Sequence, residues 1–167
     1  LGISQPKIYQ GLTKFTGTKR RFELIAKVKG ISLYDDYAHH PTEIKALLKA
    51  AQAWLPNRRL IIIFQSHTYS RTKNLLKEFS QSFTLADIVI VNDIFASARE
   101  IDNLGLTGKS FTQSIKQFYP QTVYCPDKPA TLAYLKETIS KGDAIFTVGA
   151  GDNWLWHKDI IKIMKQL

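Results

Sequence analysis

The chain has 167 residues, a length typical of one domain with its own hydrophobic core. Hydrophobic residues make up 44% and charged residues 22%, as in globular proteins, and no apolar run approaches the about 20 residues needed to cross a bilayer. There is no signal-peptide pattern, and the single Cys125 cannot form an internal disulfide. We therefore expect a cytoplasmic protein with no membrane partner.

The net charge is +9, from 23 Lys and Arg against 14 Asp and Glu. The basic residues are scattered, without the arginine-rich tract or basic stripe typical of nucleic-acid binding. An anionic small substrate, or solubility alone, explains the excess equally well. We therefore expect no nucleic-acid partner.

The start of the chain favours a piece of a longer protein. The only methionine is Met164, and the chain begins at Leu1 without an initiator. A processed N-terminus or a removed tag would look the same.

The first part of the chain predicts a short helix and a hairpin. Residues 4–15 have apolar side chains at helical spacing, and residues 22–28 and 31–36 alternate as strands on either side of a Lys29-Gly30 turn. The rest of the chain alternates between helix and strand. It predicts a helix from Pro41 to 55, a strand at 60–64, a helix around 75–83, a strand at 88–91, a loop at 94–109, a helix capped by Ser110, a strand at 123–124, a helix around 132–139, a strand at 144–148 and a helix opened by Asp152.

This alternation predicts an α/β fold. We expect a Rossmann-like open, twisted, mostly parallel sheet of about six strands with helices on both faces, and the hairpin offers one antiparallel edge strand. No internal repeat or low-complexity segment is present.

Four predicted strands end in polar or glycine-rich turns. These turns are Asp35-Asp36, Gln65 to Arg71, Asn92-Asp93 and Gly149 to Asp152. Because ligands of open α/β sheets bind outside the carboxyl ends of the strands, we expect the site where these turns converge.

Residues 35–40 carry two aspartates and two histidines. They could hold a metal, but adjacent strand residues point to opposite faces, so Asp35 and Asp36 do not easily face one ion. One aspartate could instead accept hydrogen bonds from loop amides, or bind ligand hydroxyls as an acidic residue at a strand end does for a ribose. All three interpretations remain open.

His67 and Arg71 lie four residues apart across a strand-to-helix turn. Both could reach a carboxylate or phosphate beside a helix start, with Arg71 offering a planar fork. A surface salt bridge for Arg71 and a helix cap for His67 are equally compatible with the spacing.

Several other patterns carry no chemistry. The Gly-Lys-Ser at 108–110 is not a phosphate loop, because the position of the required earlier glycine holds Asn103, and we interpret it as a helix-capping turn. Gly149 and Gly151 allow close approach to a ligand or to a neighbouring strand. Cys125 has no visible base and is expected to be inert. There is no Ser-His-Asp or Cys-His constellation.

Four ordered motifs resemble those of the Mur ligases. They are Phe15-Thr-Gly-Thr-Lys-Arg-Arg-Phe-Glu23, Asp35-Asp-Tyr-Ala-His-His-Pro-Thr-Glu43, Phe64-Gln-Ser-His-Thr-Tyr-Ser-Arg-Thr72 and Val148-Gly-Ala-Gly-Asp152. This family uses ATP to join an amino acid to a UDP-muramyl carboxylate through an acyl phosphate. The motifs match only the C-terminal third of such an enzyme.

The resemblance implies a domain organisation and ligands. Residues 1–18 would be the tail of a missing central ATPase domain, and residues 19–167 the C-terminal domain, with the N-terminal and central domains as partners. ATP and Mg would be held mainly by the central domain, and UDP-N-acetylmuramate and L-alanine would be the substrates. We expect no catalytic residue and no metal site within this domain alone, and no ligase turnover by it.

The resemblance also implies roles for individual residues. Arg21 would lie near the ATP phosphates and Asp36 at the nucleotide edge, with Tyr37, His39 and His40 beside them. His67 and Arg71 would hold the carboxylate of the incoming amino acid.

One departure bears on the acceptor. Ser66 and Thr68 stand where the family motif often has proline and arginine, so one guanidinium is missing. A sister Mur ligase that recycles a tripeptide is one alternative. A stand-alone nucleotide-binding α/β module is the alternative from another class.

Overall fold

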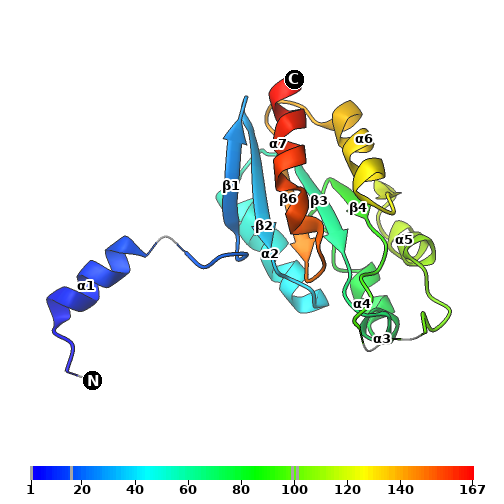
Figure 1. Cartoon of the computed structure of the whole chain (residues 1–167), viewed down its shortest axis with the longest axis horizontal. Coiled ribbons are helices and arrows are strands. Elements are labelled where there is room, and N and C mark those ends of the chain that lie inside the picture. The colour runs from blue at the N-terminus through cyan, green and yellow to red at the C-terminus, as the bar shows by residue number, and fades with distance from the viewer. Residues whose placement is uncertain (1, 16, 99, 101) are drawn as a thin grey trace.

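The computed structural model describes residues 2–15, 17–98, 100 and 102–167. These residues form one six-stranded sheet in the order β1-β2-β6-β3-β4-β5 (Figure 1). The strands are β1 (Glu23–Val28), β2 (Ile31–Asp36), β3 (Leu60–Gln65), β4 (Ile88–Val91), β5 (Thr122–Tyr124) and β6 (Ala144–Gly149). Only β1 and β2 pair antiparallel, and every other neighbouring pair is parallel, which confirms the predicted sheet and its antiparallel edge strand.

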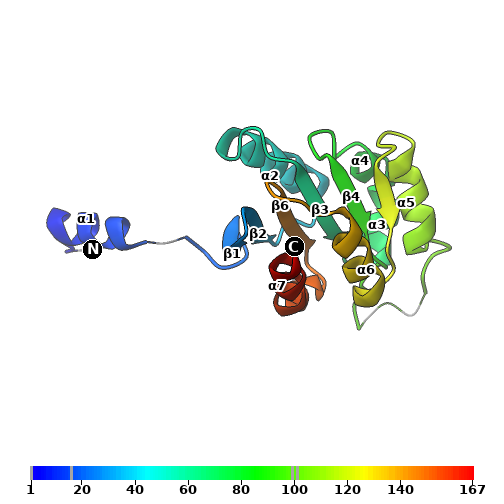
Figure 2. The same ribbon diagram turned by 90° about the horizontal axis from the view of Figure 1, so that it is seen from above.

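Helices cover both faces of the sheet, as predicted (Figure 2). One face packs against α2 (Pro41–Trp54), α4 (Leu76–Ser80) and α5 (Gly108–Lys116), and the other against α6 (Lys128–Thr138) and α7 (His157–Gln166). The central strand β3 is buried on both faces, because Ile62 and Phe64 pack on the first face while Ile61 and Ile63 pack on the second. The candidate site lies at the carboxyl end of this buried strand.

Three helix starts differ from the sequence prediction. The helix expected around 75–83 is preceded by α3 (Tyr69–Asn74), and Leu75 separates α3 from α4. The sequence did not predict α3 because its polar residues give no apolar period. Thr107, not Ser110, caps α5: its hydroxyl accepts from the Ser110 N–H at 3.1 Å, and Ser110 is the third helical residue of a capping box. Asp152 precedes a 3₁₀ turn, η1 (Asn153–Trp156), and makes no side-chain cap there.

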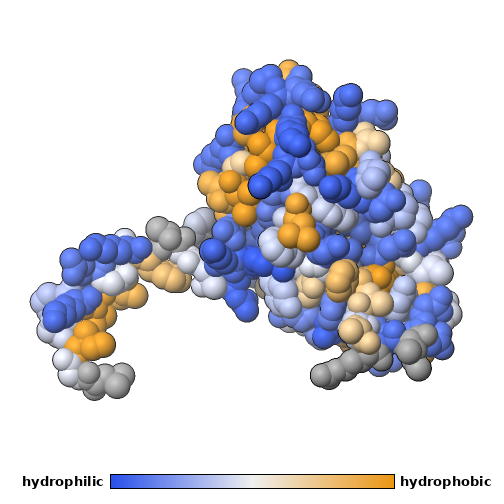
Figure 3. Space-filling view, in the orientation of Figure 1, coloured by the Kyte–Doolittle hydropathy of each residue, from blue (hydrophilic) through white to orange (hydrophobic). Residues whose placement is uncertain are grey.

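The first helix, α1 (Gln5–Lys14), stands away from the sheet (Figures 1 and 2). None of its residues is buried, although Ile8 and Leu12 form an apolar side, which Figure 3 shows as a patch along the helix. An amphipathic helix without a partner gains no stability from burial. Among the described residues, no helix is long and apolar enough to span a membrane.

Candidate functional site

The carboxyl ends of four parallel strands lie side by side. In the sheet register Asp36 pairs with Val148, Phe64 pairs with Val148 on the other side of β6, and Phe64 also pairs with Val91 of β4. The polar turns that follow β2, β3, β4 and β6 therefore meet at one edge, as predicted. This edge is the candidate site.

Asp35 points into the protein and is an internal anchor. Its carboxylate is 1% exposed, and it accepts from the Arg20 Nε at 2.8 Å and the Thr147 hydroxyl at 2.7 Å, with His157 Nε2 3.7 Å away. Burial alone would raise the pKa of Asp35, but the hydrogen bonds from His157, Thr147 and Arg20 outweigh it, and the pKa is lowered. Asp35 is therefore an ionised structural group.

Asp36 points to the other side and orders two loops. Its Oδ2 accepts from the Phe22 N–H at 2.7 Å and its Oδ1 from the Ala38 N–H at 2.8 Å. Burial raises its pKa against the effect of these bonds. These two bonds are the ones expected if an aspartate accepts hydrogen bonds from loop amides. Each carboxylate oxygen keeps a second lone pair that could accept from a ligand hydroxyl.

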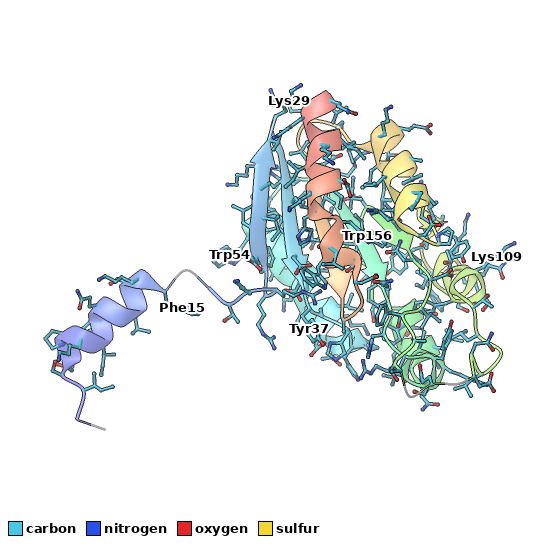
Figure 4. All side chains as sticks on the ribbon, viewed as in Figure 1. Phe15, Lys29, Tyr37, Trp54, Lys109 and Trp156 are labelled. Atoms are coloured by element: carbon cyan, nitrogen blue, oxygen red, sulfur yellow. The ribbon has the colours of Figure 1, made fainter. Side chains whose placement is uncertain are left out.

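Arg21 lies at the surface between two residues with left-handed backbone. Arg20 has φ +57° and Phe22 has φ +47°, conformations that only the surrounding hydrogen bonds maintain. A cavity of about 440 Å³ opens here, close to Tyr37, which Figure 4 places at the carboxyl-end edge. It is lined by Arg21, Asp36, Tyr37, His39 and Glu43, and by the apolar Phe22, Ala38, Ala46, Leu47 and Ala50.

Four of the five predicted nucleotide residues thus line one cavity, and His40 is the exception. The Nδ1 of His40 accepts from the Thr42 N–H at 3.3 Å and caps α2, while Glu43 accepts from the His40 N–H at 3.1 Å. His40 therefore holds the start of the helix behind the cavity. A nucleotide contact for these five residues stays a prediction.

The structure brings His67 and Arg71 together. The imidazole stacks on Phe95, with ring centroids 5.7 Å apart. Burial lowers the pKa of His67, and the positive charges of Arg71 and His39 lower it further. Because His39 lines the cavity, His67 lies within electrostatic reach of the cavity. The His67 ring is thus neutral near pH 7.

The guanidinium of Arg71 has one buried nitrogen, Nη1, that lacks a hydrogen-bond partner among the described residues. Since an unsatisfied buried donor costs free energy, such a group in a native protein needs an explanation. A carboxylate or phosphate would complete it.

Glu100 lies next to this pair and was not predicted. Its carboxylate accepts from the Tyr69 N–H at 2.8 Å, the Ser70 N–H at 2.9 Å and the Ser70 hydroxyl at 2.7 Å. No spacing in the sequence links Glu100 to a segment 30 residues away. The role of Arg20 was not predicted either. The signal was that adjacent strand residues point to opposite sides, so one aspartate of the pair Asp35-Asp36 should face inward, where one arginine of the pair Arg20-Arg21 could meet it.

The remaining candidate motifs have structural roles. Gly149 and Gly151 pack against Gln65, so their close approach is to a neighbouring strand. Burial raises the pKa of Cys125 to about 11, which agrees with an inert thiol. Among the described residues, no three His, Cys, Asp or Glu side chains are grouped as a metal site requires.

The chain matches a family model over residues 20–151, described as "Mur ligase, glutamate ligase domain", and it belongs to this family. The chain is similar to a UDP-N-acetylmuramate–L-alanine ligase of Desulforamulus reducens, with 46% identity over 99% of the chain and 36% of that protein.

Two solved structures are similar to this chain over 99% of its length. One is the UDP-N-acetylmuramate–alanine ligase of Thermotoga maritima, with a TM-score of 0.79, 25% identity and 34% of that chain covered. The other is a murein peptide ligase of Psychrobacter arcticus, with a TM-score of 0.75, 26% identity and 34% covered. The chain thus spans about a third of the length of the relatives it matches.

Proposed function

We propose that the chain is the C-terminal part of an ATP-dependent UDP-N-acetylmuramate–L-alanine ligase, an enzyme that forms an amide bond. The observation that carries this proposal is the buried Nη1 of Arg71, which has no partner in the described part of the chain and lies near the neutral His67, a pair suited to an amino-acid carboxylate. The 46% identity to a ligase of that name supports the acceptor.

We also propose the domain boundary between residues 18 and 19. Residues 1–18 would belong to the preceding domain and residues 19–167 to the C-terminal domain. The absence of any buried residue in α1 supports this division. A chain shortened to residues 19–167 should unfold at the same temperature as the 167-residue chain, and a lower temperature would mean that α1 stabilises this domain.

The cavity beside Arg21 suits part of a nucleotide. It has an apolar wall that includes Phe22, a cation at Arg21 and an acceptor at Asp36, the combination that a nucleoside phosphate requires. Arg21 would face the phosphates and Asp36 a ribose hydroxyl. Mg²⁺ would be held by the preceding domain, and the bound ATP would supply the phosphoryl group that activates the muramyl carboxylate.

The residues of this chain would then act by positioning. The Arg71 fork and the His67 ring hold the carboxylate of the alanine, which fixes where its amine lies. Holding a nucleophile in attack geometry and excluding water are effects that need no general base from this domain. The chain alone would therefore show no turnover.

The test uses the full-length protein with UDP-N-acetylmuramate and ATP. Phosphate release is followed with L-alanine, glycine, L-serine or the tripeptide supplied in turn. Release that depends on L-alanine supports the proposal. Release with none of them would overturn it and favour a stand-alone nucleotide-binding module.

The tripeptide ligase is the second candidate. It is favoured by the similarity to the murein peptide ligase structure and by Ser66 and Thr68 in place of the usual motif residues. Release of phosphate with the tripeptide and not with L-alanine would establish it.

A further inference from the structure

The loop between β4 and α5 holds residues 66–73 at three points. The Phe95 carbonyl accepts from the Thr68 N–H at 2.9 Å, and the Phe95 N–H donates to the Ser66 carbonyl at 2.8 Å. Further along, Glu100 accepts from the start of α3. Beyond it, the Leu104 carbonyl accepts from Lys73 Nζ at 2.7 Å.

The segment held in this way is strained. Thr68 has φ +71°, a conformation that β-branched residues rarely adopt, and it is the N-cap residue of α3. Such strain persists only where surrounding contacts hold the backbone in place. Without the loop, we expect residues 66–70 to relax and the direction of Arg71 to be lost.

Glu100 contributes a negatively charged group to one of the three points. Burial tends to raise the pKa of its carboxyl, but the hydrogen bonds from Ser70 and Tyr69 outweigh it and the pKa is lowered. The carboxylate is therefore ionised at neutral pH, and charge-assisted hydrogen bonds of this kind are stronger than neutral ones.

We propose that Glu100 is a positioning residue for the carboxylate of the incoming amino acid. Its own carboxylate accepts from the N–H groups of Tyr69 and Ser70, so the ligand is left with the guanidinium of Arg71 and the ring of His67. The same contact fixes the start of α3 and aims that guanidinium. This inference rests on the proposed function for the identity of the ligand, but not for the contact itself.

Glu100→Gln is the variant that tests the contact. Glutamine has the same shape but offers one carbonyl oxygen and an NH₂ group, which meets an N–H donor. Asp102→Asn is the matched control, because it removes the same charge from the same loop and keeps an oxygen for the Leu104 N–H.

The first measurement is amide hydrogen exchange in the 167-residue chain. Exchange at Tyr69 and Ser70 should become about tenfold faster in Glu100→Gln and stay unchanged in Asp102→Asn. Unchanged exchange in Glu100→Gln would overturn the proposed contact. This measurement needs no activity, so it judges Glu100 even if the proposed function fails.

The second measurement is steady-state kinetics of the full-length protein. Glu100→Gln should raise KM for L-alanine about tenfold while KM for ATP and the unfolding temperature stay close to wild type. An equal rise in both KM values together with a lower unfolding temperature would indicate a merely structural role and overturn the positioning role.

A milder variant keeps the proposal testable if Glu100→Gln does not fold. Ser70→Ala removes only the hydroxyl that donates to Glu100 at 2.7 Å. It should raise KM for L-alanine by a smaller factor, about threefold, with KM for ATP unchanged. An unchanged KM for L-alanine would count against the positioning role.

Discussion

Arg20 and Asp35 form an ion pair beneath the candidate site, with Arg20 Nε 2.8 Å from Asp35 Oδ2. The Arg20 side chain also donates to the Gly149 carbonyl at 2.8 Å, so it ties the start of β1 to β2 and to the turn after β6. Its neighbour Arg21 is exposed at the cavity. Two adjacent arginines thus have opposite tasks, one holding the edge together and the other facing outward.

The first prediction separates these tasks. Arg20→Gln should lower the free energy of unfolding by about 2 kcal/mol or more, because it leaves the buried Asp35 carboxylate without its cation. Arg21→Gln is the matched control and should change it by less than about 0.5 kcal/mol. Urea unfolding of both variants measures the difference, and equal losses would contradict the division.

The second prediction concerns the titration of His67. The positive charge of Arg71 lowers the pKa of His67 and the negative charge of Glu100 raises it. Arg71→Gln should therefore raise the pKa of His67, and Glu100→Gln should lower it further below the ordinary value of 6.5. NMR titration of the imidazole measures both shifts.

The same titration has a consequence for stability. Because the pKa of folded His67 is depressed, its contribution to stability is present above the ordinary pKa of 6.5 and is lost as the pH falls through the folded value. A carboxylate bound beside the ring should raise the folded pKa. A His67 pKa that does not respond to either variant would show that the ring lies away from both charges.

The third prediction concerns Gly149, the last residue of β6. Gly149 has φ +130°, and a Cβ there would collide with the Gln65 carbonyl oxygen. Gly149→Ala should lower the free energy of unfolding by about 2 kcal/mol or more. Gly11→Ala in α1 is the control, because a Cβ added at Gly11 meets nothing within 4 Å and alanine favours helix. If thermal unfolding shows Gly11→Ala to be less stable than Gly149→Ala, the close contact of Gly149 with Gln65 does not limit the residue at this position.

The fourth prediction concerns Arg71 in the full-length protein. Arg71→Lys keeps the charge but loses the planar fork, so KM for L-alanine should rise about tenfold with KM for ATP unchanged. Arg58→Lys is the control, because Arg58 donates to the Gly30 and Asp143 carbonyls at the opposite end of the sheet. A normal KM in Arg71→Lys would remove Arg71 from the carboxylate site.

The sequence alone determined the architecture. The apolar run at 60–64 and the alternation of helix and strand predicted the parallel sheet, and the polar turns after four strands predicted the edge at which they meet. Burial acts on every residue of a strand or helix face, so it leaves a period that is visible in the sequence. The position of His67 and Arg71 shortly after the central strand also follows from the sequence, and their role toward a carboxylate stays a prediction.

Only the tertiary structure decided which polar residues line the cavity and which turn to partners within the protein. Asp35, Arg20 and His40 turn to internal partners, and Asp36 shares its carboxylate between two loops. Glu100 reaches its partners across a loop that leaves no periodic pattern. A hydrogen bond depends on the position of single atoms brought together by the whole fold, so adjacent residues of the same type, such as Arg20 and Arg21, cannot be told apart until the chain has folded.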